Sequence, residues 1–265
     1  MTAQILAFCN QKGGVGKSTT TFQLARAAVL AGRRVLAIDN DPQGNLTSNA
    51  ARDTVPDDQA GLADVLSSHT TDTMRDVIVP GVWPGLDVVP TSGTTLESVR
   101  DELTIAGAGR EARLRNALAP VLEDYDLILI DCAPSLDQLT VNSLTAAHGV
   151  VVVTHTKKWS LDGLSKLLDT IESVKTYYNA GLRVAGIIVN HHEEQTLGGR
   201  QWFEELHKAA VERELAVFTP PIPKRVVIAD ATEASLGVDE FGSAEGTALA
   251  AVYAAHLNSI EGALA

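Results

Sequence analysis

The residue types best suited to chemistry gather in one short stretch near the start of the chain, NQKGGVGKST, residues 10–19. It follows the phosphate-binding pattern G-x-x-x-x-G-K-[ST], except that Gln11 occupies the first glycine position. In such a loop, backbone N–H groups converge on an anion, and the start of the following helix adds partial positive charge. Lys17 is then expected to reach the β- and γ-phosphates of a nucleotide, and the Ser18 hydroxyl to ligate Mg²⁺.

Three carboxylates stand at the ends of apolar runs further along the chain. Asp39 and Asp41 lie two residues apart in IDNDPQGN, and because side chains alternate along a strand, both can point toward the same phosphates. Asp131 closes the run YDLILID, which has the form of a Walker B strand whose acid holds Mg²⁺ through water. Acids beside a polyphosphate indicate metal-bound water and a water positioned for in-line attack.

The elements that position these residues can be predicted from short apolar runs that alternate with helical patterns. Continuous rather than alternating apolarity indicates strands with both faces covered, as in a parallel sheet between helices. The predicted fold class is therefore α/β, a doubly wound, mostly parallel sheet flanked by helices, with ligands at the carboxyl ends of the strands. The predicted strands are residues 5–9, 35–38, 86–89, 127–130, 150–154 and 184–189, the predicted helices are 18–31, 136–147 and 161–178, and residues 53–84 read as loops and small helices.

The bulk composition sets limits on the class of protein. With 265 residues, 45% of them hydrophobic and 20% charged, the chain suits one α/β domain over residues 1–265. The formal charge of −12 argues against a surface that attracts nucleic acid everywhere, but it allows a local basic patch. The N-terminus has no basic segment before a long apolar run, and no apolar stretch approaches the roughly 20 residues that a membrane-spanning helix needs. We therefore expect a cytoplasmic protein.

The motifs are similar to those of a known family. KGGVGKST, DNDPQGNLT and DLILIDCAPSL, followed by LTVNSL and later LDGLSKLL, resemble the ParA/Soj partition ATPases, which are deviant Walker A members of the MinD/ParA superfamily. The resemblance runs from about residue 4 to residue 190 and thins beyond that point. It implies a P-loop ATPase with ATP and Mg²⁺ as cofactors.

The resemblance also implies roles for individual residues. In that family two ATP-bound subunits pack face to face, and the early lysine, here Lys12, reaches the partner's phosphates in the manner of an arginine finger. Asp41 would position the attacking water, Asp39 and Asp131 would act through the metal's waters, and Asn190 would read adenine. The implied sets are Lys12, Lys17 and Asp41 for catalysis; Gly13, Gly14, Val15, Gly16, Lys17, Ser18, Thr19 (at the α-phosphate) and Asn190 for the nucleotide; and Ser18, Asp39 and Asp131 for the metal.

Three segments depart from the family pattern and carry the candidate DNA contacts. HTKKW at residues 155–159 contains Lys157 and Lys158. HHEEQTLGGRQW at residues 191–202 replaces the family's arginine-bearing loop, and Arg200, although displaced along the chain, is the candidate for its basic role. The family's I-P-R stretch appears here as Ile222-Pro223-Lys224, followed by Arg225. Ordinary surface charge is the alternative interpretation of Lys157, Lys158, Lys224 and Arg225, and the two lysines could also touch nucleotide or a partner subunit. The histidine pair is not expected to bind metal, because adjacent side chains on a strand face opposite ways and the ligand set is incomplete.

The function predicted is that of a partition ATPase for a plasmid or chromosome. It would dimerise on ATP and Mg²⁺, bind DNA without sequence preference near the nucleoid, and be released when a ParB-like or other adaptor stimulates its slow hydrolysis. Two alternatives stay open: positioning of a protein cargo by the same cycle, and a nucleotide-switched recruitment protein in which hydrolysis is incidental. From Val226 onward the chain has no Lys or Arg, so the basic membrane-binding helix of MinD-type ATPases is not expected.

Overall fold

The computed structural model describes residues 2–155 and 160–265. Lys157 and Lys158 lie outside the described residues. In chain order the elements are β1 (Gln4–Cys9), α1 (Lys17–Leu30), β2 (Val35–Asn40), α2 (Asn45–Ala50), α3 (Leu62–Leu66), α4 (Met74–Val77), β3 (Val79–Pro80), β4 (Leu86–Val89), α5 (Thr95–Ile105), the 3₁₀ turn η1 (Arg110–Ala112), α6 (Arg113–Leu118), the 3₁₀ turn η2 (Ala119–Val121), β5 (Leu127–Cys132), α7 (Gln138–Ala146), β6 (Gly149–His155), α8 (Ser160–Tyr177), β7 (Arg183–Asn190), α9 (Leu197–Val211), β8 (Val217–Phe218), α10 (Val226–Glu233) and α11 (Ala244–Leu264).

The strands form one eight-stranded sheet in the order β3-β4-β2-β5-β1-β6-β7-β8. Every pairing is parallel except that of the short edge strand β3 with β4. Strand β1 lies between β5 and β6, so the chain turns toward one half of the sheet after β1 and crosses to the other half after β5. Such a reversal of strand order is where doubly wound sheets bind their ligands, and the phosphate loop follows β1 directly.

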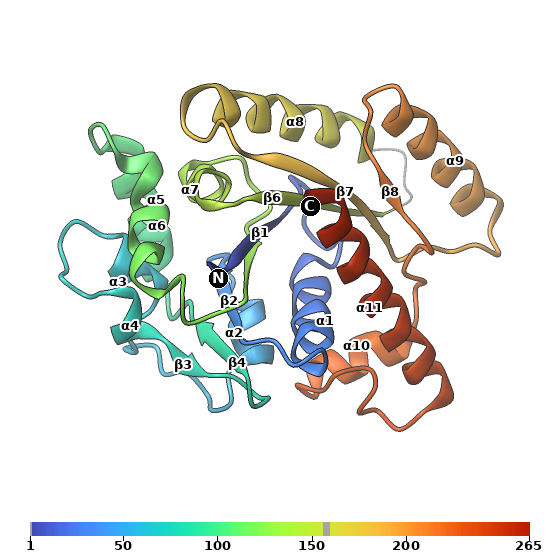
Figure 1. The fold of residues 1–265 in the computed structure, drawn as a ribbon, viewed down its shortest axis with the longest axis horizontal. Coiled ribbons are helices and arrows are strands. Elements are labelled where there is room, and N and C mark those ends of the chain that lie inside the picture. The colour runs from blue at the N-terminus through green and yellow to red at the C-terminus, as the bar shows by residue number, and fades with distance from the viewer. Residues whose placement is uncertain (1, 156–159) are drawn as a thin grey trace.

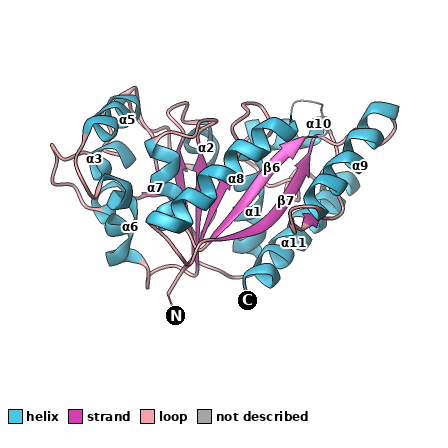
Figure 2. Cartoon of the chain, turned by 90° about the horizontal axis from the view of Figure 1, so that it is seen from above, coloured by secondary structure: helices cyan, strands magenta, loops and turns pink. Residues whose placement is uncertain are grey.

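Alternation along the strands divides the interior into two cores. In β1, Ile5 and Ala7 join one buried cluster, which includes residues of α7 and α8, while Leu6 and Phe8 join the other, which includes residues of α1 and α11. Figures 1 and 2 show the sheet between these two layers of helices. A strand buried on both faces must be apolar at every position, which is the pattern that the sequence showed.

The predicted α/β class is confirmed, and the predicted strands lie within observed ones. Most observed strands extend the predicted range by one or two residues at an end, because strand hydrogen bonding continues into polar residues that hydropathy leaves out. Asp39 and Asn40 thus belong to β2, and Asp131 to β5. The segment 53–84, read as loops and small helices, holds α3, α4 and also the edge strand β3.

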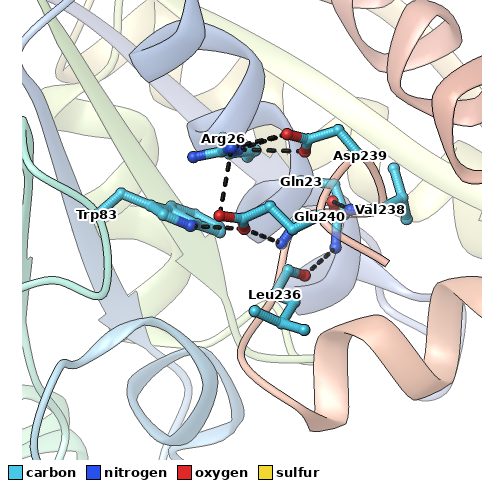
Figure 3. A network of polar contacts seen from close by, with 8 residues as sticks. Gln23, Arg26, Trp83, Leu236, Val238, Asp239 and Glu240 are labelled. Atoms are coloured by element: carbon cyan, nitrogen blue, oxygen red, sulfur yellow. Dashed lines mark hydrogen bonds and ion pairs between the residues drawn. The ribbon is translucent and has the colours of Figure 1, made fainter. Parts of the chain in front are cut away.

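A polar network anchors the segment between α10 and α11 to α1 (Figure 3). The Arg26 guanidinium lies 2.7 Å from the Asp239 carboxylate, 3.3 Å from Glu240, and 5.1 Å from the centre of the Trp83 ring. The Trp83 indole N–H donates to Glu240 at 2.8 Å. Because Arg26 and both acids are less than a third exposed, these pairs are screened less than surface pairs are. The network joins α1, the β3–β4 turn and the C-terminal segment.

Helix α11 packs on α1 through a stripe at helical spacing. Leu249, Tyr253, His256, Leu257 and Ile260 are buried on one face. The opposite face has no Lys or Arg. Among the described helices, none is long and apolar enough to cross a membrane.

We expect acid to destabilise the protein through His256, which is fully buried in this stripe. Burial lowers the pKa of His256 from 6.5 to about 4, so the unfolded chain takes up the extra proton first. The free energy of unfolding should therefore be fully developed above pH 6.5. It should fall as the pH drops toward 4, by about 1.4 kcal/mol for each unit of pKa difference crossed. Urea unfolding between pH 7 and pH 4.5 measures this slope.

His256→Gln removes the titrating group, so its free energy of unfolding should change less with pH than that of the wild type. The exposed His69 offers a control, because His69→Gln removes an imidazole that stays in water in both states. An unchanged slope in His256→Gln would show that other groups govern the acid response.

Candidate nucleotide site

The loop between β1 and α1 has the backbone of a phosphate-binding loop. Gly14 and Gly16 have φ of 70° and 83°, in the left-handed region that favours glycine. A side chain at Gly16 would also collide with the Asn190 amide. Asn10 fixes the start of the loop: its amide donates to the Val153 carbonyl at 2.7 Å and its Oδ1 accepts the Lys12 N–H at 2.9 Å.

A cavity of about 380 Å³ opens above this loop. Lys17, at the first position of α1, is 6% exposed and lies in its wall. A cation there, together with the free N–H groups of the first helical turn, makes the floor of the cavity attractive to anions. The lining residues are Gly13, Gly14, Gly16, Lys17, Ser18, Thr19, Asp41, Gln43, Asn45, Asn49, Pro134, Ala229, Thr232 and Glu233.

Asp39 and Asp131 lie side by side beneath the loop. They are register partners in the parallel strands β2 and β5, and both are fully buried. Two residues earlier, Ala37 and Leu129 face the α1 layer, so alternation turns both carboxylates toward α1. The sheet therefore brings two acids from distant parts of the sequence to the helix that carries Lys17 and Ser18.

The two carboxylates have different surroundings. Asp39 Oδ2 accepts the Thr47 N–H at 2.7 Å and the Thr47 hydroxyl at 2.8 Å, and Oδ1 accepts the Asp41 N–H at 3.3 Å. Burial nevertheless raises the pKa of Asp39 to about 6, with these hydrogen bonds opposing it. Asp39 does not line the cavity. Its hydrogen bonds connect it to Asp41, which does line the cavity, and its role at the metal's waters stays a prediction.

Asp131 is a buried carboxylate whose oxygens both lack a hydrogen-bond partner among the described residues. Burial and the neighbouring Asp39 charge raise the pKa of Asp131 well above its usual range, while Ser18 and Lys17 oppose that shift. An orphaned carboxylate beside a serine hydroxyl is an oxygen donor set of the kind that Mg²⁺ takes, with waters and phosphates completing the shell. No group of three or more His, Cys, Asp or Glu among the described residues could hold a metal alone. The residues fit Mg²⁺ only together with a nucleotide.

Asp41 lies in the described wall of the nucleotide cavity, whereas Lys12 does not. Asp41 is 6% exposed and lies in the cavity wall, with its Oδ1 accepting the Gln43 N–H at 3.0 Å. Lys12 is partly exposed and is absent from the described lining of its own chain's cavity. The family resemblance implies a role beside the phosphates for Asp41 and a role in a partner subunit for Lys12; both roles stay predictions.

Asn190 lies beneath the phosphate loop rather than in the cavity. It is 1% exposed, and its amide nitrogen lies within 3.4 Å of the Val15 and Gly16 carbonyls and the Thr20 hydroxyl. Its Oδ1 accepts the His191 N–H at 2.8 Å. In this structure Asn190 therefore supports the loop, and its contact with adenine stays a prediction.

One wall of the cavity comes from a segment that no sequence motif associates with it. Ala229, Thr232 and Glu233 of α10 line the side facing the loop. Gln23 of α1 holds this helix in place, because its amide donates to the Thr232 hydroxyl at 3.2 Å. These residues come more than 200 positions after the loop, and only the tertiary packing of α10 on α1 brings them there.

Three of the candidate DNA-contacting residues meet in a second cavity, of about 920 Å³, which we call the C-terminal groove. Arg200 comes from α9, and Lys224 and Arg225 from the residues just before α10. Its apolar part includes Phe203, Val226 and Leu249. The full lining is His192, Glu193, Glu194, Gln195, Thr196, Arg200, Phe203, Glu204, Pro220, Pro221, Pro223, Lys224, Arg225, Val226, Glu245, Ala248, Leu249 and Val252.

A phosphate loop at the switch point of a doubly wound sheet, with acids on the neighbouring strands, defines a P-loop nucleotide-binding protein. A family model described as an AAA domain matches residues 3–184. Sporulation initiation inhibitor protein Soj of Bacillus subtilis (strain 168) is 36% identical over 229 residues, which are 86% of this chain and 87% of that protein. Chromosome partitioning protein ParA of Caulobacter vibrioides is 36% identical over 236 residues, 86% and 83% of the two chains.

A solved structure shares the fold of this chain. The protein described as cobyrinic acid a,c-diamide synthase from Mycobacterium smegmatis, with bound ATP analogue and magnesium, is 34% identical, with a TM-score of 0.75 over 88% of this chain and 92% of that one. The chain described here belongs to the ParA/Soj family of partition ATPases, within the MinD/ParA superfamily.

We expect Asp131→Asn to stabilise the protein in the absence of nucleotide and Mg²⁺. Burial disfavours the ionised form of Asp131, so keeping this acid in the fold costs free energy at pH 7. Asn has the same size and no carboxyl group to ionise, so the free energy of unfolding should rise by on the order of 1–3 kcal/mol. The added stability that Mg²⁺ and a non-hydrolysable ATP analogue give the wild type should be largely lost. Thermal unfolding with and without these ligands measures both effects.

Asp87→Asn is the matched control, because Asp87 is also a strand aspartate but accepts the Tyr125 hydroxyl at 2.9 Å. It should bring no gain in stability and leave the ligand effect intact. A loss of stability in ligand-free Asp131→Asn would contradict the view of Asp131 as an uncompensated charge.

Proposed function

We propose that the protein is an ATP- and Mg²⁺-dependent partition ATPase that acts as a dimer on DNA. The observation that carries the proposal is the orphaned carboxylate of Asp131, held beside Ser18 and Lys17 under a complete phosphate loop. A buried charge without a partner is unfavourable in the protein alone and becomes favourable when a cation arrives with a polyphosphate.

The residues around the cavity divide the work of hydrolysis. The loop amides of Gly13 to Gly16 and the Lys17 ammonium would hold the β- and γ-phosphates, with Thr19 near the α-phosphate. Ser18 would ligate Mg²⁺, and Asp39 and Asp131 would orient the metal's waters. Mg²⁺ would neutralise charge that develops on the phosphates during transfer. Asp41, in the cavity wall, would hold the attacking water in line.

Lys12 would complete the site of a second copy of the chain. Its backbone is fixed by Asn10, but its side chain is partly exposed and does not line its own cavity. A cation that one subunit supplies to the other's phosphates makes hydrolysis depend on dimerisation. The family resemblance adds slow turnover that an adaptor protein stimulates.

The C-terminal groove would bind the DNA. Arg200, Lys224 and Arg225 lie in one cavity although they come from two separate segments, and phosphate contacts by such cations need no base recognition. Binding depends on the local phosphate contacts more than on the net charge of −12.

The alternative cargo is a protein assembly. The observation that favours it is that four carboxylates (Glu193, Glu194, Glu204 and Glu245) line the same groove as the three cations, which is a mixed surface of the kind that proteins present to one another. Binding of DNA by the ATP-bound protein separates the two cargoes.

We expect the ATP-bound protein to bind random duplex DNA, with an affinity that falls steeply as salt rises. Lys224→Ala/Arg225→Ala should weaken binding for every DNA sequence and reduce the slope of log K against log salt by about one for each phosphate that is no longer neutralised. Fluorescence anisotropy with ATP, ADP and no nucleotide over a range of salt concentrations measures affinity and slope.

Arg100→Ala/Arg115→Ala is the matched control. It removes the same charge from α5 and α6, which lie on the other side of the molecule from α9 (Figure 1). An equal loss in the control would show that the groove is not the contact surface. If the wild type fails to bind DNA at low salt with ATP present, the DNA proposal falls and the protein cargo stands.

We expect Lys12→Ala to bind ATP normally but to lose hydrolysis. A cation supplied by a partner contributes on the order of 10³–10⁵ in related phosphoryl-transfer sites, so turnover should fall toward background. Calorimetry with a non-hydrolysable analogue, sizing of the complex and phosphate release measure the three steps separately. Lys166→Ala, an exposed lysine on α8, is the control. Normal turnover in Lys12→Ala would refute the role in the partner subunit.

A further inference from the structure

The described cations of the C-terminal groove already interact with oxygen atoms of the same chain. The Lys224 ammonium lies 2.9 Å from the Glu193 carboxylate, and the Arg225 guanidinium 2.8 Å from Glu245. The third cation, Arg200, donates to the backbone carbonyl of Glu194 at 3.2 Å. Each of the three cations that the structure describes in the groove is therefore already bound to an oxygen of the same chain.

The backbone holds the first pair together. The Lys224 N–H donates to the His192 carbonyl at 3.1 Å and the His192 N–H donates to the Ile222 carbonyl at 2.9 Å. These bonds place residue 193 next to residue 224 before the side chains interact. The Glu193 carbonyl in turn accepts the Thr196 N–H at 3.0 Å, which closes the turn that leads to α9.

The second pair depends on the start of α11. Glu245 lies in the first turn of that helix, after the N-cap Ser243, whose hydroxyl accepts the Gly246 N–H at 2.9 Å. A carboxylate is favoured there by the partial positive charge of the helix start. Two interactions therefore hold the Glu245 carboxylate in place: the start of α11 and the ion pair with Arg225.

Among the described residues that line the groove, the charge balance is negative. The lining has the carboxylates Glu193, Glu194, Glu204 and Glu245 against the cations Arg200, Lys224 and Arg225, four against three. Glu194 and Glu204 have no ion pair in the described part of the chain. A polyanion that approaches the groove meets this negative charge, and its phosphates can contact Lys224 and Arg225 only by displacing the carboxylates that already hold them.

We propose that Glu193 and Glu245 restrain DNA binding by occupying Lys224 and Arg225, so that the DNA phosphates must compete with the protein's own carboxylates. This inference rests on the proposed DNA-binding function and adds its regulation. The four side chains are 44–65% exposed, so DNA can reach them and the competing pairs are weak enough to exchange. The restraint sets a modest affinity, which suits a protein that must leave DNA after hydrolysis.

We expect Glu193→Gln and Glu245→Gln each to raise the affinity of the ATP-bound protein for random duplex DNA by about two- to fivefold, the range of an exposed ion pair. The double variant should gain about four- to twenty-five-fold if the two pairs act independently. The slope of log K against log salt should become steeper by about one for each cation released. Fluorescence anisotropy over a salt series measures both, and thermal unfolding checks that the fold is intact.

Glu204→Gln is the matched control. It removes the same charge from the same groove but has no ion pair among the described residues, so it releases no cation. It should change affinity less than either variant and leave the salt slope unaltered. An equal gain in Glu204→Gln would overturn the competition and leave only general repulsion.

The remaining outcomes separate the inference from the function on which it rests. If the wild type binds DNA and neither Glu193→Gln nor Glu245→Gln strengthens binding, the restraint is wrong and the DNA function stands. If only the variants bind, the restraint is confirmed in its strongest form. If neither the wild type nor the double variant binds at low salt with ATP, the DNA function itself is wrong.

Discussion

The adjacent buried carboxylates of Asp39 and Asp131 are the constraint on which the rest of the structure depends. Two carboxyl groups on neighbouring strands oppose each other's ionisation, and burial removes the water that would stabilise their charges, so the pKa of each is raised. The sheet tolerates the pair because the opposing charge comes from outside the strands: Lys17, the start of α1, and the cation that the site is built to receive. Alternation along β2 and β5 turns both acids toward the face of the sheet on which α1 and the phosphate loop lie.

The parts of the fold that the sequence predicts are those specified by local signals. Buried parallel strands are apolar throughout, and the phosphate loop has a recognisable spacing of glycines and lysine. Together these two signals identify the acids at the strand ends as candidate site residues. Local signals do not place Thr232 and Glu233 at the nucleotide cavity, because the packing of α10 on α1 is a contact between distant segments. They do not reveal the buried position of Asn190 either, since the amide bonds to backbone carbonyls that no motif specifies.

The ion pairs of the basic residues could not be predicted from local sequence signals either. Arg200, Lys224 and Arg225 can be selected from the sequence by type, and the structure brings them into one groove. Their partners Glu193 and Glu245 lie 31 and 20 positions from the cations that they hold, and only the fold joins them. Helix α10 also connects this groove to the nucleotide cavity: Arg225 caps its start, and Glu233 at its end lines the cavity.

Because α10 lines the nucleotide cavity, the cavity can be complete only after this late segment of the chain has been synthesised. The phosphate loop leaves the ribosome early, whereas Glu233 comes near the end of the 265-residue chain, roughly 10–40 s later at about 5–20 residues per second. In that interval β5 and β6 must also emerge and take their places on either side of β1. A nascent chain therefore has the nucleotide motif long before it has a nucleotide site.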